Sequence, residues 1–309
     1  MLLQTMVPIF GLMALGFTAV RVGLMEQTGV KGLVLFVFNF SIPSLLLTSM
    51  VALEFPPDMD WRFLIAFYGA SLLVYGGGAL LGRFVFGRSL SEQAIFGMGA
   101  AFSNLVLMGI PIVLTALGPE ASLPMLLIIG FHSATFMPLT VILIQAGKGS
   151  EGSFGQRATR ILADVIRNPI ILGIFTGLLL NVTGIEIWPP AAGMLDFLGA
   201  AAVPCALFAM GASIAGYPLT GDVAPAVALS SLKLIVHPFF VWLIAGPLLG
   251  LSGLWMSVAV LLAAMPSAVN VYLFGARYDA APGIAARSVL LTTVGSMVTI
   301  SVILVLIGV

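Results

Sequence analysis

Two apolar stretches of the chain each carry an asparagine and a proline, residue types that interrupt a helix and offer hydrogen bonds within it. The first reads Asn104-Leu-Val-Leu-Met-Gly-Ile-Pro111, and the second reads Met265-Pro-Ser-Ala-Val-Asn270. Proline removes a backbone donor and clashes with the preceding turn, so nearby carbonyls lose their helical partners. In a bilayer such a break persists where it lines a cavity or is buried in protein. The paired breaks predict the substrate site of a carrier.

The chemistry of such a site follows from the ends of half helices. Their N-terminal ends carry partial positive charge and free N–H groups, which suit a carboxylate. Neutral amides can bind an anion without the cost of burying another charge. The expected substrate-binding residues are Asn104, Gly109, Pro111, Pro266, Ser267 and Asn270. The alternative, that each proline only kinks a membrane helix, stays open at this point.

Four ionisable side chains lie inside apolar segments: His132, Lys233, His237 and Arg287. Intramembrane charge indicates a functional role by default, so all four are candidates for counter-charge or ion coupling. Lys233 and His237 are four residues apart and share one helix face. Two alternatives stay open. The Lys233–His237 pair could be hydrogen-bonded packing residues, and Arg287 could extend to the membrane surface instead of facing an anionic substrate.

Composition places the chain in the membrane. Of its 309 residues, 60% are hydrophobic and 8% are charged, whereas soluble domains carry roughly 25% charged residues. The apolar run begins at Leu2 without a preceding basic residue, so we expect a first helix that is not cleaved. Acidic and basic residues balance at 12 each, which gives no sign of a nucleic-acid partner. Neither a catalytic nor a metal-binding motif is found, so we expect no enzyme, cofactor or metal.

A spanning helix needs about 20 mostly apolar residues. This criterion predicts an all-α protein with ten transmembrane helices: 2–20, 31–53, 62–82, 92–117, 122–146, 161–182, 192–215, 224–249, 254–276 and 283–308.

Basic residues predict how these helices are oriented. Alternate connections hold nine Lys or Arg residues, and the remaining connections hold only Arg62. The nine are Arg21, Lys31, Arg83, Arg88, Lys148, Arg157, Arg160, Arg167 and Arg277. By the positive-inside rule, both termini should be non-cytoplasmic.

The two halves, residues 1–146 and 161–309, share proline spacings. Pro8 and Pro43 are 35 residues apart, as are Pro169 and Pro204. The distance from Pro111 to His132 is 21 residues and recurs from Pro266 to Arg287, a spacing that aligns His132 with Arg287. Five helices is an odd number, so the second half would enter the membrane from the opposite side. This predicts an inverted repeat.

Several segments together resemble the auxin efflux carrier family. The first broken stretch is similar to the motif in the fourth helix of that family. Further matching segments are Arg167-Asn-Pro-Ile-Ile-Leu-Gly173, Ala202-Val-Pro-Cys-Ala-Leu-Phe-Ala-Met-Gly211, and Ala264-Met-Pro-Ser-Ala-Val-Asn270 with the later Tyr278. The resemblance covers most of the chain, and the family is distantly similar to the bile acid–sodium symporters.

The resemblance implies a fold and a mechanism. Helices 92–117 and 254–276 would cross at their breaks, with Pro111 and Pro266 at the crossover and Asn104 as the binding asparagine. Asn270 matches the family pattern more loosely. The first, second, sixth and seventh helices would form a scaffold that often makes a homodimer. The remaining six would form a transport domain that moves like an elevator within the lipid bilayer.

The substrate class implied by the resemblance is a small organic anion, such as a mono- or dicarboxylate or an auxin-like acid. The chain lacks the long central loop of the plant auxin exporters, which favours a carboxylate carrier of a bacterial inner membrane. A sodium-coupled symporter of the bile-acid type is an alternative, although no acidic residue lies clearly inside a helix. A non-enzymatic membrane sensor is another, although no soluble output domain is apparent. Gly76-Gly-Gly78 is interpreted as a helix-packing surface.

Overall fold

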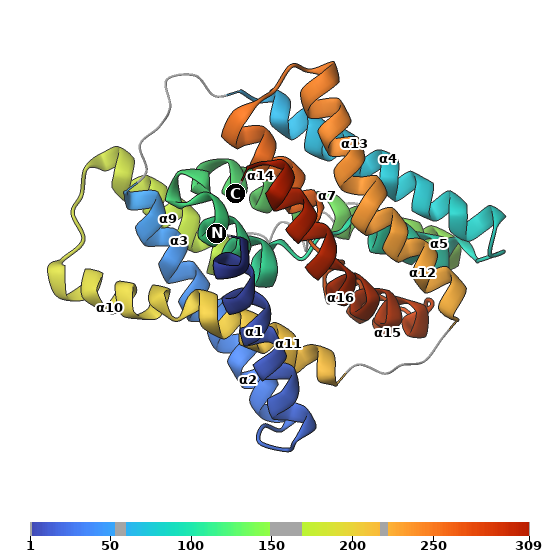
Figure 1. Ribbon diagram of the computed structural model, residues 1–309, viewed down its shortest axis with the longest axis horizontal. Coiled ribbons are helices and arrows are strands. Elements are labelled where there is room, and N and C mark those ends of the chain that lie inside the picture. Colours follow the sequence, from blue (N-terminus) through green and yellow to red (C-terminus); the bar gives the residue numbers. More distant parts are fainter. Residues whose placement is uncertain (1, 53–59, 149–168, 217–221, 309) are drawn as a thin grey trace. The chain divides into compact units, whose positions relative to one another are not determined.

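The computed structural model describes residues 2–52, 60–148, 169–216 and 222–308, and within these ranges it is helical (Figure 1). The β-type pairing in the described part is one isolated bridge, which confirms the all-α class. Arg157, Arg160 and Arg167, and the first part of the predicted helix 161–182, lie outside the described residues.

Six helical runs in this part are long and apolar enough to cross a membrane: Gln27–Val51, Arg62–Phe84, Pro119–Lys148, Pro189–Ala215, Val223–Leu248 and Pro282–Leu306. Shorter apolar helices cover Val7–Arg21, Leu105–Leu117, Pro169–Thr183 and Gly253–Ala263. The composition and these helices identify an integral membrane protein.

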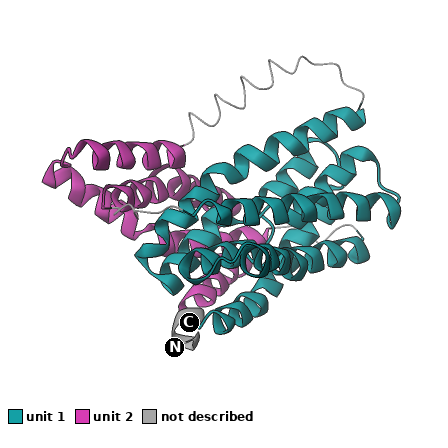
Figure 2. Ribbon diagram, turned by 90° about the horizontal axis from the view of Figure 1, so that it is seen from above, with its two compact units in different colours: residues 1–6, 60–151, 217–309 teal, residues 7–59, 152–216 magenta. Residues whose placement is uncertain are grey.

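The chain divides into two compact units, which are coloured separately in Figure 2. Unit 1 contains residues 1–6, 60–151 and 217–309, and unit 2 contains residues 7–59 and 152–216. The helices of unit 1 are α4 (Arg62–Phe84), α5 (Leu90–Ala101), η2 (Leu105–Gly109), α6 (Ile110–Leu117), η3 (Pro119–Ala121), α7 (Ser122–Lys148), α12 (Val223–Ser231), η4 (Leu232–Val236), α13 (His237–Leu243), η5 (Ile244–Leu248), α14 (Gly253–Ala263), α15 (Asn270–Arg277) and α16 (Pro282–Leu306).

Unit 2 is built by close packing of small residues. Its helices are α1 (Leu2–Arg21, from residue 7), α2 (Gln27–Phe36), η1 (Val37–Ser41), α3 (Ile42–Val51), α9 (Pro169–Thr183), α10 (Pro189–Ala200) and α11 (Ala202–Ala215). A Cβ on Gly211 would collide with the carbonyl oxygen of Met13, and a Cβ on Gly16 with that of Phe208. The backbones of α1 and α11 are therefore in contact, as small residues allow in membrane helices.

Prolines explain where the helices widen. Pro43, Pro111 and Pro238 each lie two residues beyond the end of a π-helical turn, namely η1, η2 and η4. A proline ring clashes with the carbonyl one turn earlier and provides no N–H to bind it. A wider turn accommodates both defects without ending the helix.

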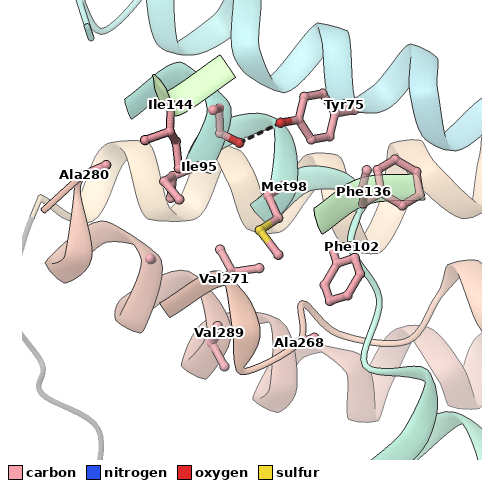
Figure 3. Packing of buried hydrophobic residues seen from close by; sticks show 13 residues of the cluster. Tyr75, Ile95, Met98, Phe102, Phe136, Ile144, Ala268, Val271, Ala280 and Val289 are labelled. Atoms are coloured by element: carbon pink, nitrogen blue, oxygen red, sulfur yellow. Dashed lines mark hydrogen bonds between the residues drawn. The ribbon is translucent and has the colours of Figure 1, made fainter. Parts of the chain in front are cut away.

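The core of unit 1 surrounds α5. Figure 3 shows Met98 and Phe102 packed among side chains of α4, α7, α15 and α16. Tyr75 on α4 fixes this cluster, because its hydroxyl donates to the carbonyl oxygen of Ala94 at 3.1 Å and lies 3.0 Å from Oγ1 of Thr140. The cluster includes Phe102 and Ala268, which lie in the two helix breaks described next.

Candidate functional site

Two interrupted helices of unit 1 cross through a short antiparallel bridge. The first interruption covers residues 102–104, between α5 and η2, and the second covers residues 264–269, between α14 and α15. Ser103 and Ser267 form the bridge. The N–H of Asn104 donates to the carbonyl of Pro266 at 2.8 Å, and the N–H of Ala268 donates to the carbonyl of Phe102 at 3.0 Å. Each break thus supplies hydrogen-bond partners that the other has lost.

The first break lies further from its proline than the sequence predicts. Pro111 is in the first turn of α6 and directly follows the π turn η2, so the helix continues through this proline. The chain leaves helical geometry at residues 102–104, around Asn104. Pro266, by contrast, lies within its break. The two prolines therefore occupy different places relative to the bridge.

Side chains from two further helices hold the bridge in place. The N–H of Ser103 donates to Nε2 of His132 on α7 at 3.0 Å. The N–H of Ser267 donates to Oγ1 of Thr292 on α16 at 3.1 Å. In this pairing the counterpart of His132 is Thr292. Arg287 lies five residues before Thr292, about one and a half turns nearer the start of α16.

The two serine hydroxyls reach the ends of the preceding half helices in different ways. Oγ of Ser267 donates directly to the carbonyl oxygen of Gly99 at 2.7 Å. The matching position in the other helix is Ala263, four residues before Ser267 as Gly99 is four before Ser103. There, Nζ of Lys233 lies between Oγ of Ser103 at 2.8 Å and the carbonyl oxygen of Ala263 at 2.7 Å.

Lys233 continues into a hydrogen-bonded chain. Its Nζ lies 2.9 Å from Nδ1 of His237, and Nε2 of His237 lies 2.7 Å from Oγ of Ser71. Ser71 donates its own hydrogen to the carbonyl of Phe67 at 2.6 Å. This leaves Nε2 of His237 as the donor to Ser71, so Nδ1 accepts from Lys233. Both Lys233 and His237 are fully buried, and the predicted shared helix face is present.

His132 is enclosed by aromatic rings. It stacks on Phe102 with ring centroids 4.6 Å apart, and Phe136 and Phe67 pack against its other sides at 5.1 and 5.9 Å. Since Nε2 accepts from Ser103, the ring hydrogen is on Nδ1. Nδ1 is buried and finds no hydrogen-bond partner among the described residues.

The other predicted residues surround the crossing at varying distance. Asn104 is buried and immediately precedes η2, while Asn270 is half-buried at the start of α15. The N–H of Gly109 donates to the carbonyl of Asn104 at 3.1 Å, which ties η2 to the break. Arg287 is half-buried on α16. The crossing therefore brings together Asn104, Pro266, Ser267, His132, Lys233 and, through Lys233, His237.

Three residues of this site were not among the predicted ones. Ser103 and Thr292 support the bridge, and Ser71 ends the chain from Lys233. A signal for Ser103 was present, because both breaks carry a serine beside the predicted polar residues. Nothing in the sequence links Ser71 or Thr292 to residues more than twenty positions away in the chain.

Lys233 has no carboxylate partner among the described residues. The ion pairs among the described residues involve Arg62 and Arg88, each at the start of a helix or in the turn before one. The three partners of Lys233 are a hydroxyl, an imidazole and a carbonyl, all formally neutral. In its ammonium form, a buried lysine without a carboxylate partner would make this region attractive to an anion.

Comparison with known proteins gives a family and several relatives. A family model described as "Membrane transport protein" matches residues 1–304. A protein named "Putative malonate transporter" from Rhizobium meliloti is 30% identical over 97% of this chain and 94% of its own. An uncharacterized transporter from Methanothermobacter thermautotrophicus is 24% identical over 96% of this chain and 95% of its own. The mouse "Lysosomal cholesterol signaling protein" is 28% identical over 67% of this chain, but only 25% of its own length is matched.

Proposed function

Since the chain belongs to the membrane transport protein family, and its resemblance to the auxin efflux carriers is thereby confirmed, we propose that this transporter carries a small organic anion through the helix crossing. The family and the relatives identify a membrane transporter and not an enzyme. The proposal adds the chemical class of the substrate and the place where it binds.

One observation carries the proposal: a buried lysine, whose ammonium charge would have no carboxylate partner among the described residues, lies at the point where two broken helices meet. Lys233 contacts only formally neutral groups in the described structure. An anion bound nearby would balance this charge in a low-dielectric interior, where attraction between opposite charges is strongest. A cationic substrate would instead be repelled.

The groups that contact the substrate should be those that the crossing presents beside Lys233. Asn104 precedes η2, and Asn270 begins α15. The N-terminal ends of these helices carry partial positive charge, which suits a carboxylate. Lys233 uses its hydrogens on protein atoms, so its charge acts on the anion without direct contact.

A dicarboxylate is the substrate we favour. The Rhizobium relative, whose printed name refers to malonate, matches nearly the whole of both chains. Two carboxylates would also use two half-helix ends, one from each broken helix. The matching pairs of hydrogen bonds at the crossing support an inverted repeat of ten helices, in which each half contributes one such end.

The proposed movement follows the division of the chain. Unit 1 contains the crossing and corresponds to the transport domain, and unit 2 corresponds to the scaffold, which we expect to carry the homodimer contact. In an elevator mechanism unit 1 would carry the bound anion as one body. The continuous hydrogen bonding around the crossing supports such rigidity within unit 1.

The test is binding and transport of malonate by the purified protein. A ligand that binds only the folded state stabilises it, by about 2.7 kcal/mol when the free ligand concentration is a hundred times Kd. The melting temperature rises as a result. We expect malonate to raise the melting temperature and radiolabelled malonate to enter proteoliposomes. Asn104→Ala should melt as a folded protein and lose both effects.

A matched control is Asn181→Ala. The side chain of Asn181 donates to the carbonyl of Val51 at 2.8 Å within unit 2, whereas the crossing belongs to unit 1. This variant should lose some stability and still bind malonate. Wild-type affinity in Asn104→Ala would refute the assignment of Asn104. The absence of a shift with every mono- and dicarboxylate tested would refute the substrate class.

A further inference from the structure

The backbone around Asn104 is held by three hydrogen bonds, and one of them comes from a side chain. The N–H of Ser103 donates to Nε2 of His132 at 3.0 Å. The N–H of Asn104 donates to the carbonyl of Pro266, and its own carbonyl accepts from the N–H of Gly109. These bonds fix the backbone before and after the asparagine.

We infer that His132 is a positioning residue for the substrate, because it holds the backbone from which Asn104 presents its side chain to the anion. The inference rests on the proposed function and names a residue that acts through another one and not by contact. A binding group must be held within about 0.5 Å of its productive position. His132 acts on Asn104 through the preceding residue, Ser103, whose N–H it accepts.

The imidazole of His132 can do this because its own place is fixed. Its ring stacks on Phe102 with centroids 4.6 Å apart and an interplanar angle of 15°. Phe136 and Phe67 each pack against it at an interplanar angle of 60°. Aromatic pairs prefer such defined geometries. Phe102 is also the first residue of the break, so His132 contacts two successive residues there, one by stacking and one by a hydrogen bond.

The second break also has a side chain that accepts the N–H of its serine, but a different residue follows. The N–H of Ser267 donates to Oγ1 of Thr292, as that of Ser103 donates to His132. The residue after Ser267 is Ala268, which has no polar side chain to present to a substrate. The two acceptors should therefore contribute unequally, and loss of the His132 acceptor should weaken anion binding more than loss of the Thr292 acceptor.

The experiment measures the Kd of malonate for the full-length protein in detergent. His132→Phe keeps an aromatic ring beside Phe102 and removes the acceptor of the Ser103 N–H. We expect the Kd to rise about tenfold, the order of one lost hydrogen bond to the substrate. His132→Gln puts an amide oxygen at the same reach as Nε2, so its Kd should stay within about threefold of wild type. Thr292→Val should raise the Kd less than His132→Phe does.

Tyr75→Phe is the matched control for lost stability. It removes a buried hydroxyl of unit 1 that bonds to Ala94 on α5 and Thr140 on α7. This variant should melt at a lower temperature and keep the wild-type Kd. If His132→Phe gives no folded protein, His132→Asn takes its place. The shorter amide matches the reach of Nδ1 and not of Nε2, so its Kd should rise where that of His132→Gln does not.

Amide hydrogen exchange over residues 102–105, measured without malonate, reports on the held backbone itself. Exchange should be faster in His132→Phe than in wild type, because the Ser103 N–H has lost its acceptor. In His132→Gln it should stay close to wild type.

Four outcomes would overturn the inference. They are a wild-type Kd in a folded His132→Phe, a His132→Gln that binds as weakly as His132→Phe, a Kd that rises as much in Tyr75→Phe or Thr292→Val, and wild-type exchange over residues 102–105 in His132→Phe. If wild type binds no mono- or dicarboxylate, the proposed function fails. The exchange measurement then still decides whether His132 holds the break.

Discussion

At the scale of single residues, the buried side-chain nitrogen and oxygen atoms described at the crossing have hydrogen-bond partners, apart from Nδ1 of His132. The two serines of the bridge each engage a side chain and a half-helix end. Burying a polar group without a hydrogen-bond partner costs free energy. The hydrogen bonds made by these serines therefore stabilise the helix breaks. His132 is the exception, with a ring hydrogen that meets no described partner.

Ser267→Ala tests this account. The change removes the hydroxyl that donates to the carbonyl of Gly99 and leaves that buried oxygen without this donor. We expect a loss of about 1–3 kcal/mol in the free energy of unfolding, measured by denaturation in detergent. Ser257→Ala, on α14, removes only a bond to a carbonyl of its own helix and should cost much less. Equal losses in both variants would argue against a special role for the crossing.

At the scale of elements, glycine brings α4 and α5 close enough to support the break. A Cβ on Gly78 would lie 2.8 Å from both the carbonyl oxygen of Phe96 and the Cβ of Ala100. The neighbouring Gly77 and Gly76 meet nothing within 4 Å. The packing surface predicted for this glycine run is therefore real but depends on one of its three residues.

The matched pair Gly78→Ala and Gly77→Ala separates packing from helix propensity. Alanine stabilises a helix over glycine by about 1 kcal/mol. Gly77→Ala should therefore keep or raise the melting temperature. Gly78→Ala should lower it, because the backbone of α5 cannot move aside without disturbing the core around Tyr75. A stable Gly78→Ala variant would show that α4 and α5 can separate freely.

At the scale of the whole molecule, the two units differ in what their contacts do. Unit 2 packs backbone against backbone at Gly16 and Gly211, while unit 1 contains the interrupted helices and the buried Lys233. Two arginines connect helix ends within unit 1. Arg62 donates to the carbonyl of Leu249 at 2.8 Å, and Arg88 pairs with Asp222 at 2.7 Å. Each contact joins the start of one helix to the loop beside another helix. This matching arrangement supports the proposed repeat.

The predicted orientation can be tested on the intact chain. An odd count of crossings in each half, with basic residues in alternate connections, places both termini outside the cytoplasm. A C-terminal alkaline phosphatase fusion expressed in a bacterial inner membrane should be active, and a C-terminal green fluorescent protein fusion should be dark. A fusion at Lys148 should show the reverse. A fluorescent C-terminal fusion would refute the orientation.

Much of this protein could be predicted from its sequence because a bilayer imposes strong rules. Hydrophobic length indicates helices, and proline with asparagine inside an apolar run indicates a break. The family resemblance, confirmed over residues 1–304, rests on those same motifs. Asn104, Pro266, Ser267, His132 and Lys233 were all recognised as candidates in this way.

Only the tertiary structure decided how these residues meet. Proline spacing aligned His132 with Arg287, whereas the hydrogen bonds to the bridge come from His132 and Thr292. The family resemblance implied that Pro111 lies at the crossover, whereas Pro111 follows a π turn and the chain leaves helical geometry at residues 102–104. The reason is physical. A local pattern shows that a backbone group has lost its helical partner, but its new partner is a carbonyl, imidazole or ammonium far away in the sequence.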